Sequence, residues 1–144
     1  MWFSKKEAGK SSDEKPKGQV TTKAAGDAAE SIALAHLQKA GLMLLDTNYR
    51  TPGRGGGEID LIMKDADNTL VFIEVRQRAS QSYGGAGGSI SAVKQKRIVF
   101  AARHFLMRFK TLPPCRFDVV LIHGVVGRSD APEIEWLRSA FDAF

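Results

Sequence analysis

The 144-residue chain has little of what several common classes of protein require. It contains one cysteine, Cys115, and therefore cannot form an internal disulfide. Its three histidines are scattered, and none lies beside Cys115 at the spacing of a zinc site. No apolar run approaches the ~20 residues that span a bilayer, and no apolar segment follows the first lysines as in a secretory signal. We therefore expect a soluble, cytoplasmic protein that does not use a membrane.

The first 22 residues lack the apolar periodicity that a packed element needs. Five lysines are interspersed there with Ser, Gly, Glu and Asp. A segment of this composition buries too little apolar surface to offset the entropy of ordering it. We therefore expect residues 1–22 to be a disordered basic tail. Because the apolar fraction of the chain is an ordinary 43%, residues 23–144 are expected to form one domain.

The net charge of +5 is concentrated in the middle of the chain. Residues 50–116 carry twelve Lys and Arg against five Asp and Glu, whereas residues 117–144 carry two against five. A basic field around a few carboxylates suits a polyanion held against a metal ion, because phosphates attract cations and the metal needs carboxylates. A solvated basic surface that keeps the protein soluble explains the same charge equally well.

Apolar periodicity and turn residues predict an α/β chain in the order helix, three strands, helix, strand, helix. The predicted helices are residues 21–40, a helix capped by Ser89 or Ser91 that reaches about Lys110, and an amphipathic segment over residues 134–144. The predicted strands are a buried strand over residues 42–50, a hairpin formed by residues 58–63 and 69–78, and residues 116–123.

Acidic side chains on the predicted hairpin are candidates for a metal site. Side chains alternate along a strand, so Glu58 shares a face with Asp60, and Glu74 shares a face with Arg76. If the register follows the turn, Asp60 lies opposite Glu74. Two adjacent carboxylates repel unless a cation or a proton intervenes. Mg²⁺ is bound through one or two carboxylates with water and phosphate, and Asp60, Glu74 and the carbonyl of Val75 offer such ligands. The metal would activate a water molecule for phosphodiester cleavage.

The spacing of these residues also fits a different structure. Acidic residues on the exposed face of a hairpin are common, and Glu74 with Arg76 or Arg78 would form an ordinary ladder of ion pairs. The residues by themselves leave both interpretations open.

Motifs along most of the chain resemble those of the bacterial YraN family. They are Gly26-x-x-x-Glu30-x-x-Ala33, Asn48-Tyr49-Arg50, Gly55-Gly56-Gly57-Glu58-Ile59-Asp60-Leu61-Ile62, Phe72-Ile73-Glu74-Val75-Arg76-x-Arg78, Lys94-Gln95-x-Arg97, Arg116-Phe117-Asp118-Val119-Val120 and Glu135-Trp136-x-x-x-Ala140-Phe141. The family is placed in the PD-(D/E)XK nuclease superfamily, near archaeal Holliday-junction resolvases. The resemblance implies a nuclease-like domain with a restriction-endonuclease-like αβββαβ core, in which a mixed sheet is flanked by helices.

The resemblance also implies roles for particular residues. It makes Asp60 and Glu74 ligands of Mg²⁺ or Mn²⁺, with Glu30 reaching the metal directly or through water. It places at position 76 the lysine that orients or deprotonates the attacking water, where this chain has Arg76. Arginine stays protonated, so Arg76 can hold a phosphate but is a poor general base. The expected catalytic set is therefore Glu30, Asp60, Glu74 and Arg76.

Four basic residues are predicted to face a nucleic acid, namely Arg54, Arg78, Lys94 and Arg97. Lys94 and Arg97 lie one helical turn apart. The glycine run that follows Arg54 either contacts the nucleic-acid backbone or only begins the hairpin, and no Walker-type lysine follows it.

The sequence thus predicts an endonuclease that uses Mg²⁺ or Mn²⁺ to hydrolyse DNA, branched or otherwise structured, and it leaves a homodimer open. One alternative is a noncatalytic nucleic-acid-binding module that retains the nuclease scaffold. The other is a protein-interaction scaffold that uses the segment around Trp136 and Phe141.

Overall fold

The computed structural model describes residues 22–53, 55–78, 90–124 and 131–142. Its elements are α1 (Thr22–Lys39), β1 (Met43–Arg50), β2 (Glu58–Lys64), β3 (Leu70–Arg78), α2 (Ala92–Leu106), β4 (Cys115–His123) and β5 (Glu133–Phe141). The predicted tail lies outside the described residues, except that Thr22 begins α1. Neither described helix is long and apolar enough to cross a membrane.

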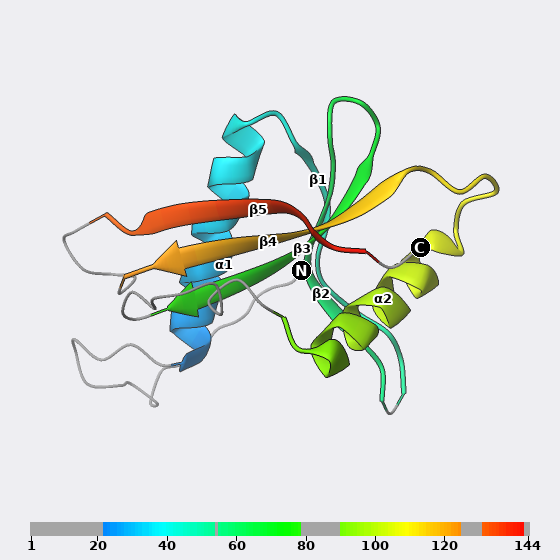
Figure 1. The fold of residues 1–144 in the computed structure, drawn as a ribbon, viewed down its shortest axis with the longest axis horizontal. Coiled ribbons are helices and arrows are strands. Elements are labelled where there is room, and N and C mark those ends of the chain that lie inside the picture. The colour runs from blue at the N-terminus through cyan, green and yellow to red at the C-terminus, as the bar shows by residue number, and fades with distance from the viewer. Residues whose placement is uncertain (1–21, 54, 79–89, 125–130, 143–144) are drawn as a thin grey trace, which may run out of the picture.

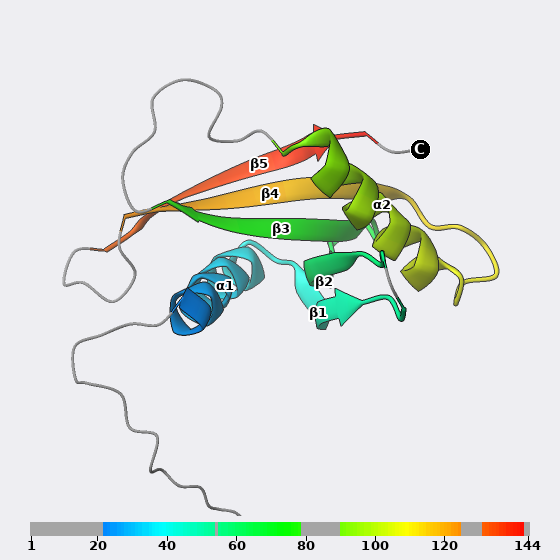
Figure 2. The same ribbon diagram turned by 90° about the horizontal axis from the view of Figure 1, so that it is seen from below.

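The five strands form one mixed sheet in the order β1-β2-β3-β4-β5 (Figure 1). β3 and β4 are parallel, and the other neighbouring strands are antiparallel. The two helices lie on opposite faces of the sheet (Figure 2). This arrangement confirms the predicted α/β class and is consistent with a restriction-endonuclease-like core, to which β5 adds an edge strand.

α1 lies against the sheet through small side chains. Ala29, Ala33 and Leu37 recur every four residues and are buried against the strands. The helix ends before Gly41, whose φ of +106° suits the left-handed cap that glycine favours. Because alanine lets the helix axis approach closely, the neighbouring Glu30 is brought near the sheet. This element agrees with the predicted first helix.

α2 makes the crossover that a parallel pair of strands requires. Its N-cap is Ser91, one of the two predicted caps, whose Oγ accepts a hydrogen bond from the Lys94 N–H at 3.1 Å. The other candidate, Ser89, lies outside the described residues. The buried residues of α2 are Ile98, Ala101, Ala102, Phe105 and Leu106.

α2 ends at Leu106, short of the predicted end near Lys110. The N–H groups of Met107 and Phe109 bond to carbonyls three residues back, at 3.3 and 3.0 Å. This tightened turn ends the helix before the two prolines are reached. Val93, in the first turn of α2, does not join the buried face, because it is 62% exposed.

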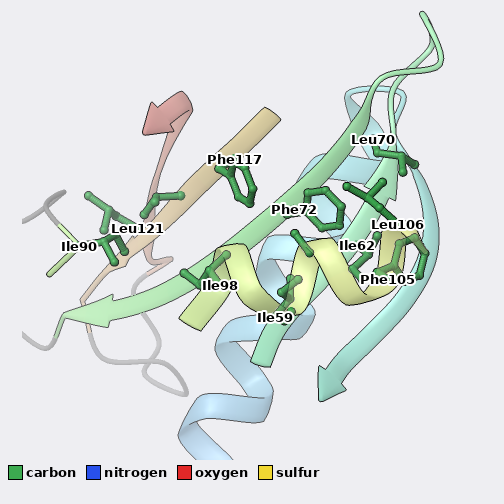
Figure 3. Packing of buried hydrophobic residues seen from close by; sticks show 13 residues of the cluster. Ile59, Ile62, Leu70, Phe72, Ile90, Ile98, Phe105, Leu106, Phe117 and Leu121 are labelled. Carbon is green, nitrogen blue, oxygen red and sulfur yellow. The ribbon is translucent and has the colours of Figure 1, made fainter. Parts of the chain in front are cut away.

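Aromatic rings join α2 to the sheet (Figure 3). The Phe72 ring of β3 stacks on that of Phe117 with their centroids 5.4 Å apart, and it meets Phe105 of α2 edge to face at 6.1 Å. Phe117 in turn stacks on Phe141 of β5 at 4.9 Å. These contacts hold α2 across β3, next to the residues that follow Phe72 along that strand.

β1 is an edge strand, and the prediction that residues 42–50 form a buried strand is wrong in this respect. Met43 is 58% exposed and Leu45 is 41% exposed. β1 has a neighbouring strand on one side only, because it is the first strand in the order of the sheet. An apolar run alone does not distinguish an edge strand from a central one.

The C-terminal segment is strand β5, so the prediction of a helix over residues 134–144 is wrong. Trp136 contacts the core on the α1 face, whereas Leu137 and Phe141 contact the core on the α2 face. Hydrophobic residues at 136, 137 and 141 suit a helix or a strand buried on both faces. The segment forms a strand because it can pair with the otherwise unpaired edge of β4. The register shifts near Ser139, whose φ is +50°.

A buried carboxylate fastens β5 to β4. Asp118 is only 1% exposed, and its oxygens accept hydrogen bonds from Trp136 Nε1 at 2.9 Å and from the Ser139 N–H at 3.0 Å. The Nε of Arg116 lies 3.1 Å from Asp118, while its Nη1 lies 2.9 Å from Asp65 in the hairpin turn. Such a buried charge is tolerated because a guanidinium group and two N–H donors lie against the carboxylate oxygens of Asp118.

We predict that Asp118→Ala lowers the free energy of unfolding by about 3–5 kcal/mol, because it leaves the Arg116 charge and two N–H donors without their acceptor. Asp118→Asn should cost less, about 1–3 kcal/mol. Urea unfolding followed by tryptophan fluorescence measures both. Asp142→Ala, at an exposed position, is the control and should stay within about 0.5 kcal/mol. A cost for Asp118→Ala no larger than that of the control would contradict the role of the network.

Candidate functional site

The predicted acidic residues lie where two neighbouring strands part. β2 and β3 pair as far as Leu61 and Ile73, and β3 then continues beside β4 alone (Figure 2). The antiparallel register places Asp60 opposite Glu74, as predicted, one step beyond the last pair. Asp60 Oδ2 accepts a hydrogen bond from the Val75 N–H at 2.8 Å. We call this point, with Asp60, Glu74 and Val75, the fork.

The side chain of Asp60 replaces a backbone partner at the fork. A strand that loses its neighbour leaves N–H and C=O groups without partners. Asp60 satisfies the Val75 N–H. In an extended strand the N–H and C=O of one residue face the same neighbour, so the Val75 carbonyl lies on the same edge of β3. Two carboxylates and a backbone carbonyl therefore adjoin one another.

Glu30 approaches the fork from α1. Its carboxylate interacts with the side chains of Asp60 and of Asn48 in β1. Burial raises the pKa of Glu30, and the charge of Asp60 raises it further, whereas the hydrogen bond with Asn48 lowers it. Three elements thus bring Glu30, Asp60 and Glu74 together, and Asn48 is a partner that sequence reasoning did not identify. Its place in the Asn48-Tyr49-Arg50 motif was the available signal.

Glu74 has a largely buried carboxylate. Its side chain is 12% exposed, and its Oε1 is buried without a hydrogen-bond partner among the described residues. Burial and the Asp60 charge raise the pKa of Glu74 to about 8, although Lys94 acts in the opposite direction. Burial also raises the pKa of Asp60. At neutral pH and with no metal ion bound, Asp60 and Glu74 therefore share one proton between their carboxyl groups.

Lys94 lies inside this cluster. Its Nζ is 3.6 Å from Glu74 Oε2, so Lys94 forms an ion pair with Glu74. The sequence predicted only that Lys94 faces a phosphate of the nucleic acid, one helical turn from Arg97. Its position three residues after the cap Ser91 was the signal that it lies in the first turn of α2, at the end that crosses the fork.

The other predicted residues occupy the surroundings of the fork. Arg76 and Arg78 continue along β3 in register with β4, and both are partly buried. Arg97 lies on α2 beside the loop between β1 and β2, and it lines a recess together with Arg50. Arg54 lies outside the described residues. The structure therefore brings Glu30, the fork and Lys94 together, with Arg97 nearby.

The donor set of the fork fits a hard cation. Within the described ranges, no three His, Cys, Asp or Glu side chains already stand in metal-binding geometry. A Mg²⁺ ion would therefore rely on Asp60, Glu74 and the Val75 carbonyl, with water and phosphate completing its octahedron, which is its usual mode of binding. The buried Oε1 of Glu74 has no hydrogen-bond partner among the described residues, so it offers a free acceptor to a cation.

We predict that Glu74→Gln stabilises the metal-free protein at alkaline pH. The pKa of Glu74 is about 8 in the folded state and near its ordinary 4.5 in the unfolded state. Between these values the folded state binds the extra proton, so the free energy of unfolding falls as pH rises through that window. Glutamine removes this loss, and the variant should gain about 1 kcal/mol or more at pH 8.5 and little at pH 5.

Urea unfolding in EDTA at both pH values measures this gain, with Glu133→Gln on the exposed side of β5 as the control. A gain for Glu74→Gln that is the same at both pH values would show that Glu74 does not hold the proton.

Comparison with known proteins places the chain in a family. Residues 29–122 match the model described as "Uncharacterised protein family UPF0102". A UPF0102 protein of Polaromonas naphthalenivorans is 62% identical over 152 residues, which cover 99% of each chain. One of Paracidovorax citrulli is 66% identical over 125 residues, covering 87% of each chain, and one of Cupriavidus pinatubonensis is 50% identical over 127 residues, covering 88% of this chain and 92% of the relative. The chain therefore belongs to the UPF0102 family, the YraN family whose motifs its sequence resembles.

Proposed function

We propose that this protein is a metal-dependent endonuclease that hydrolyses phosphodiester bonds of DNA. The observation that carries the proposal is the fork, where Asp60 and Glu74 face each other and the buried Glu74 Oε1 has no hydrogen-bond partner in the part of the chain that the structure describes. Two buried carboxylates at one point destabilise a protein unless a cation or proton joins them. The choice of DNA as substrate, and of branched or structured DNA in particular, comes from the family resemblance together with the residue types of the site.

The residues of the fork would hold Mg²⁺ or Mn²⁺. Asp60, Glu74 and the Val75 carbonyl would contact the ion, and Glu30 would do so directly or through water. Once bound, the ion supplies Lewis-acid activation of water and offsets negative charge at the phosphate. Arg76 would hold the phosphate, since a guanidinium keeps its charge and offers several donors.

Lys94 supplies a cation to the fork when no metal is bound. Its ammonium group lies 3.6 Å from Glu74, and its charge lowers the pKa of both Asp60 and Glu74. A divalent cation would compete with this ammonium group for the same carboxylate. Metal binding would then release Lys94 toward the phosphate of the substrate, beside Arg76.

We predict that the wild-type protein binds Mn²⁺ and cleaves DNA, and that Asp60→Asn loses both. Calorimetric titration with Mn²⁺ measures the first property, and cleavage of labelled duplex, flap and four-way-junction DNA measures the second. Activity should fall at least about 100-fold in Asp60→Asn, since changes to mere outer partners of a metal cost 10–100-fold. Asp67→Asn, in the exposed hairpin turn, is the matched control and should retain activity.

Two results would contradict the endonuclease proposal, and each would favour one of the two alternative functions. Salt-dependent DNA binding without cleavage of any substrate would indicate a noncatalytic nucleic-acid-binding module. No Mn²⁺ binding that depends on Asp60 and Glu74, together with no DNA binding, would indicate a protein-interaction scaffold.

We predict that Lys94→Met binds Mn²⁺ about 3–10-fold more tightly than the wild type and cleaves DNA more slowly. The gain is modest because the Lys94 side chain is 41% exposed, so solvent weakens its competition with the metal. Lys96→Met on the exposed side of α2 controls for the loss of one positive charge. Unchanged or weaker Mn²⁺ binding by Lys94→Met would show that the lysine does not compete with the metal.

A further inference from the structure

One side of α2 faces the β1–β2 hairpin and carries basic residues in a row. Lys94, Arg97 and His104 are separated by three and seven residues, which places them along one side of a helix. At the start of this row Lys94 contacts Glu74 of the fork. At its other end the His104 Nδ1 shares a hydrogen bond with the Tyr49 hydroxyl of β1. Arg97 therefore lies between the fork and the edge strand.

A polar recess opens between this side of α2 and the loop that joins β1 to β2. Its volume is about 310 Å³. It is lined by Arg50, Thr51, Gly53, Gly55, Gly56, Gly57, Glu58 and Arg97. The lining contains two arginines and one glutamate and no large apolar side chain. A small anion fits this lining better than an apolar ligand does.

Close backbone contacts give the recess its shape. A Cβ atom on Gly57 would lie 1.8 Å from the Arg97 carbonyl oxygen, and one on Gly56 would lie 2.2 Å from Thr51 Oγ1. The two ends of the loop are also joined, since the Gly57 N–H donates to Thr51 Oγ1 at 2.7 Å. Only glycine allows this approach, so the loop is held against α2 at a fixed place.

The recess lies about one nucleotide step from the fork. Glu58 lines the recess, and Asp60 of the fork is two residues further along β2, about 6.6 Å for an extended strand. On α2, Arg97 is three residues from Lys94, a rise of about 4.5 Å. A strand with one phosphate at the fork would therefore place the next phosphate near the recess.

The charges in the recess match a phosphodiester. Arg50 Nη2 lies 3.8 Å from Glu58 Oε2, so one of the two arginine charges is partly neutralised. Among the described lining residues the net charge is +1, which balances the single negative charge of a phosphodiester in a nucleic-acid strand. It would leave part of the charge of a phosphate monoester or of a free phosphate dianion unbalanced.

We propose that this recess binds the phosphodiester next to the one that is cleaved, through Arg97 and Arg50. This inference rests on the proposed function, because the fork defines which phosphate is cleaved. The recess would set the register of the strand, since a phosphate seated there allows only its neighbour to reach Asp60 and Glu74. Backbone contacts of this kind position a nucleic acid without reading its sequence.

Binding of a short fluorescein-labelled oligothymidylate, measured by anisotropy in EDTA over a range of salt concentrations, tests the recess. Arg97→Met and Arg50→Met should each weaken binding about 5-fold and reduce the slope of log Kd against log salt by about 1. Glu58→Gln should tighten binding about 2–5-fold, because it removes the negative charge of the recess. Lys96→Met, which loses the same charge elsewhere on α2, should change the affinity less than 2-fold.

Arg97→Met leaves the contact between the loop and α2 in place, because Gly57 contacts the backbone carbonyl of Arg97 and not its side chain. Equal effects of Arg97→Met and Lys96→Met on the affinity for the oligonucleotide would contradict the proposed phosphodiester site. Weaker binding by Glu58→Gln would contradict it as well. Inorganic phosphate is added as a competitor, and displacement of the oligonucleotide by phosphate at an equal concentration of phosphate groups would overturn the assignment to a phosphodiester.

The two proposals fail in different ways. If the Arg97 and Glu58 variants behave as expected but no Mn²⁺ binds through Asp60, the recess is a nucleic-acid contact and the endonuclease proposal falls. If Mn²⁺ binding and cleavage both depend on Asp60 while Arg97→Met and Lys96→Met bind the oligonucleotide equally well, the endonuclease proposal holds and the proposed phosphodiester site in the recess is rejected.

Discussion

The hydrogen bond from the Val75 N–H to the Asp60 carboxylate is the constraint on which the candidate site depends. It forms where β2 leaves β3, and it satisfies a backbone donor that would otherwise lose its partner. Because the acceptor is charged, the bond also fixes a carboxylate beside Glu74. The geometry that satisfies the backbone therefore creates an electrostatic problem, which the raised pKa of Glu74 and the contact with Lys94 only partly relieve.

The two faces of the sheet support this site by different means. On one face, alanines let α1 approach closely enough for Glu30 to reach the fork. On the other face, Phe72 and Phe105 hold α2 across β3, so that Lys94 reaches Glu74. Large rings on one face and small side chains on the other thus bring one carboxylate from α1 and one cation from α2 to the two carboxylates of the strands.

Sequence patterns predicted the elements that local physics controls. The helix cap, the turn between β2 and β3 and the alternation around Glu74 all depend on a few neighbouring residues. The turn and the alternation were predicted correctly, and the cap is Ser91, one of the two predicted candidates. The errors concern features that distant residues control. Residues 136, 137 and 141 suit a helix or a strand, and the open edge of β4 decided between them. Burial of β1 depended in the same way on which strands and helices lie beside it.

The sequence by itself determined the α/β class and singled out the acidic residues Asp60 and Glu74, because strand periodicity and residue type are enough to do so. It placed the two residues opposite each other only on the condition that the register follows the turn, and the structure supplied that register. Only the tertiary structure decided that β2 and β3 separate at these two residues and that Lys94 contacts Glu74. It also decided that the glycine loop lies against α2 and forms a basic recess there. The physical reason is that charge and burial act between residues far apart in the chain, whose separation no local pattern encodes.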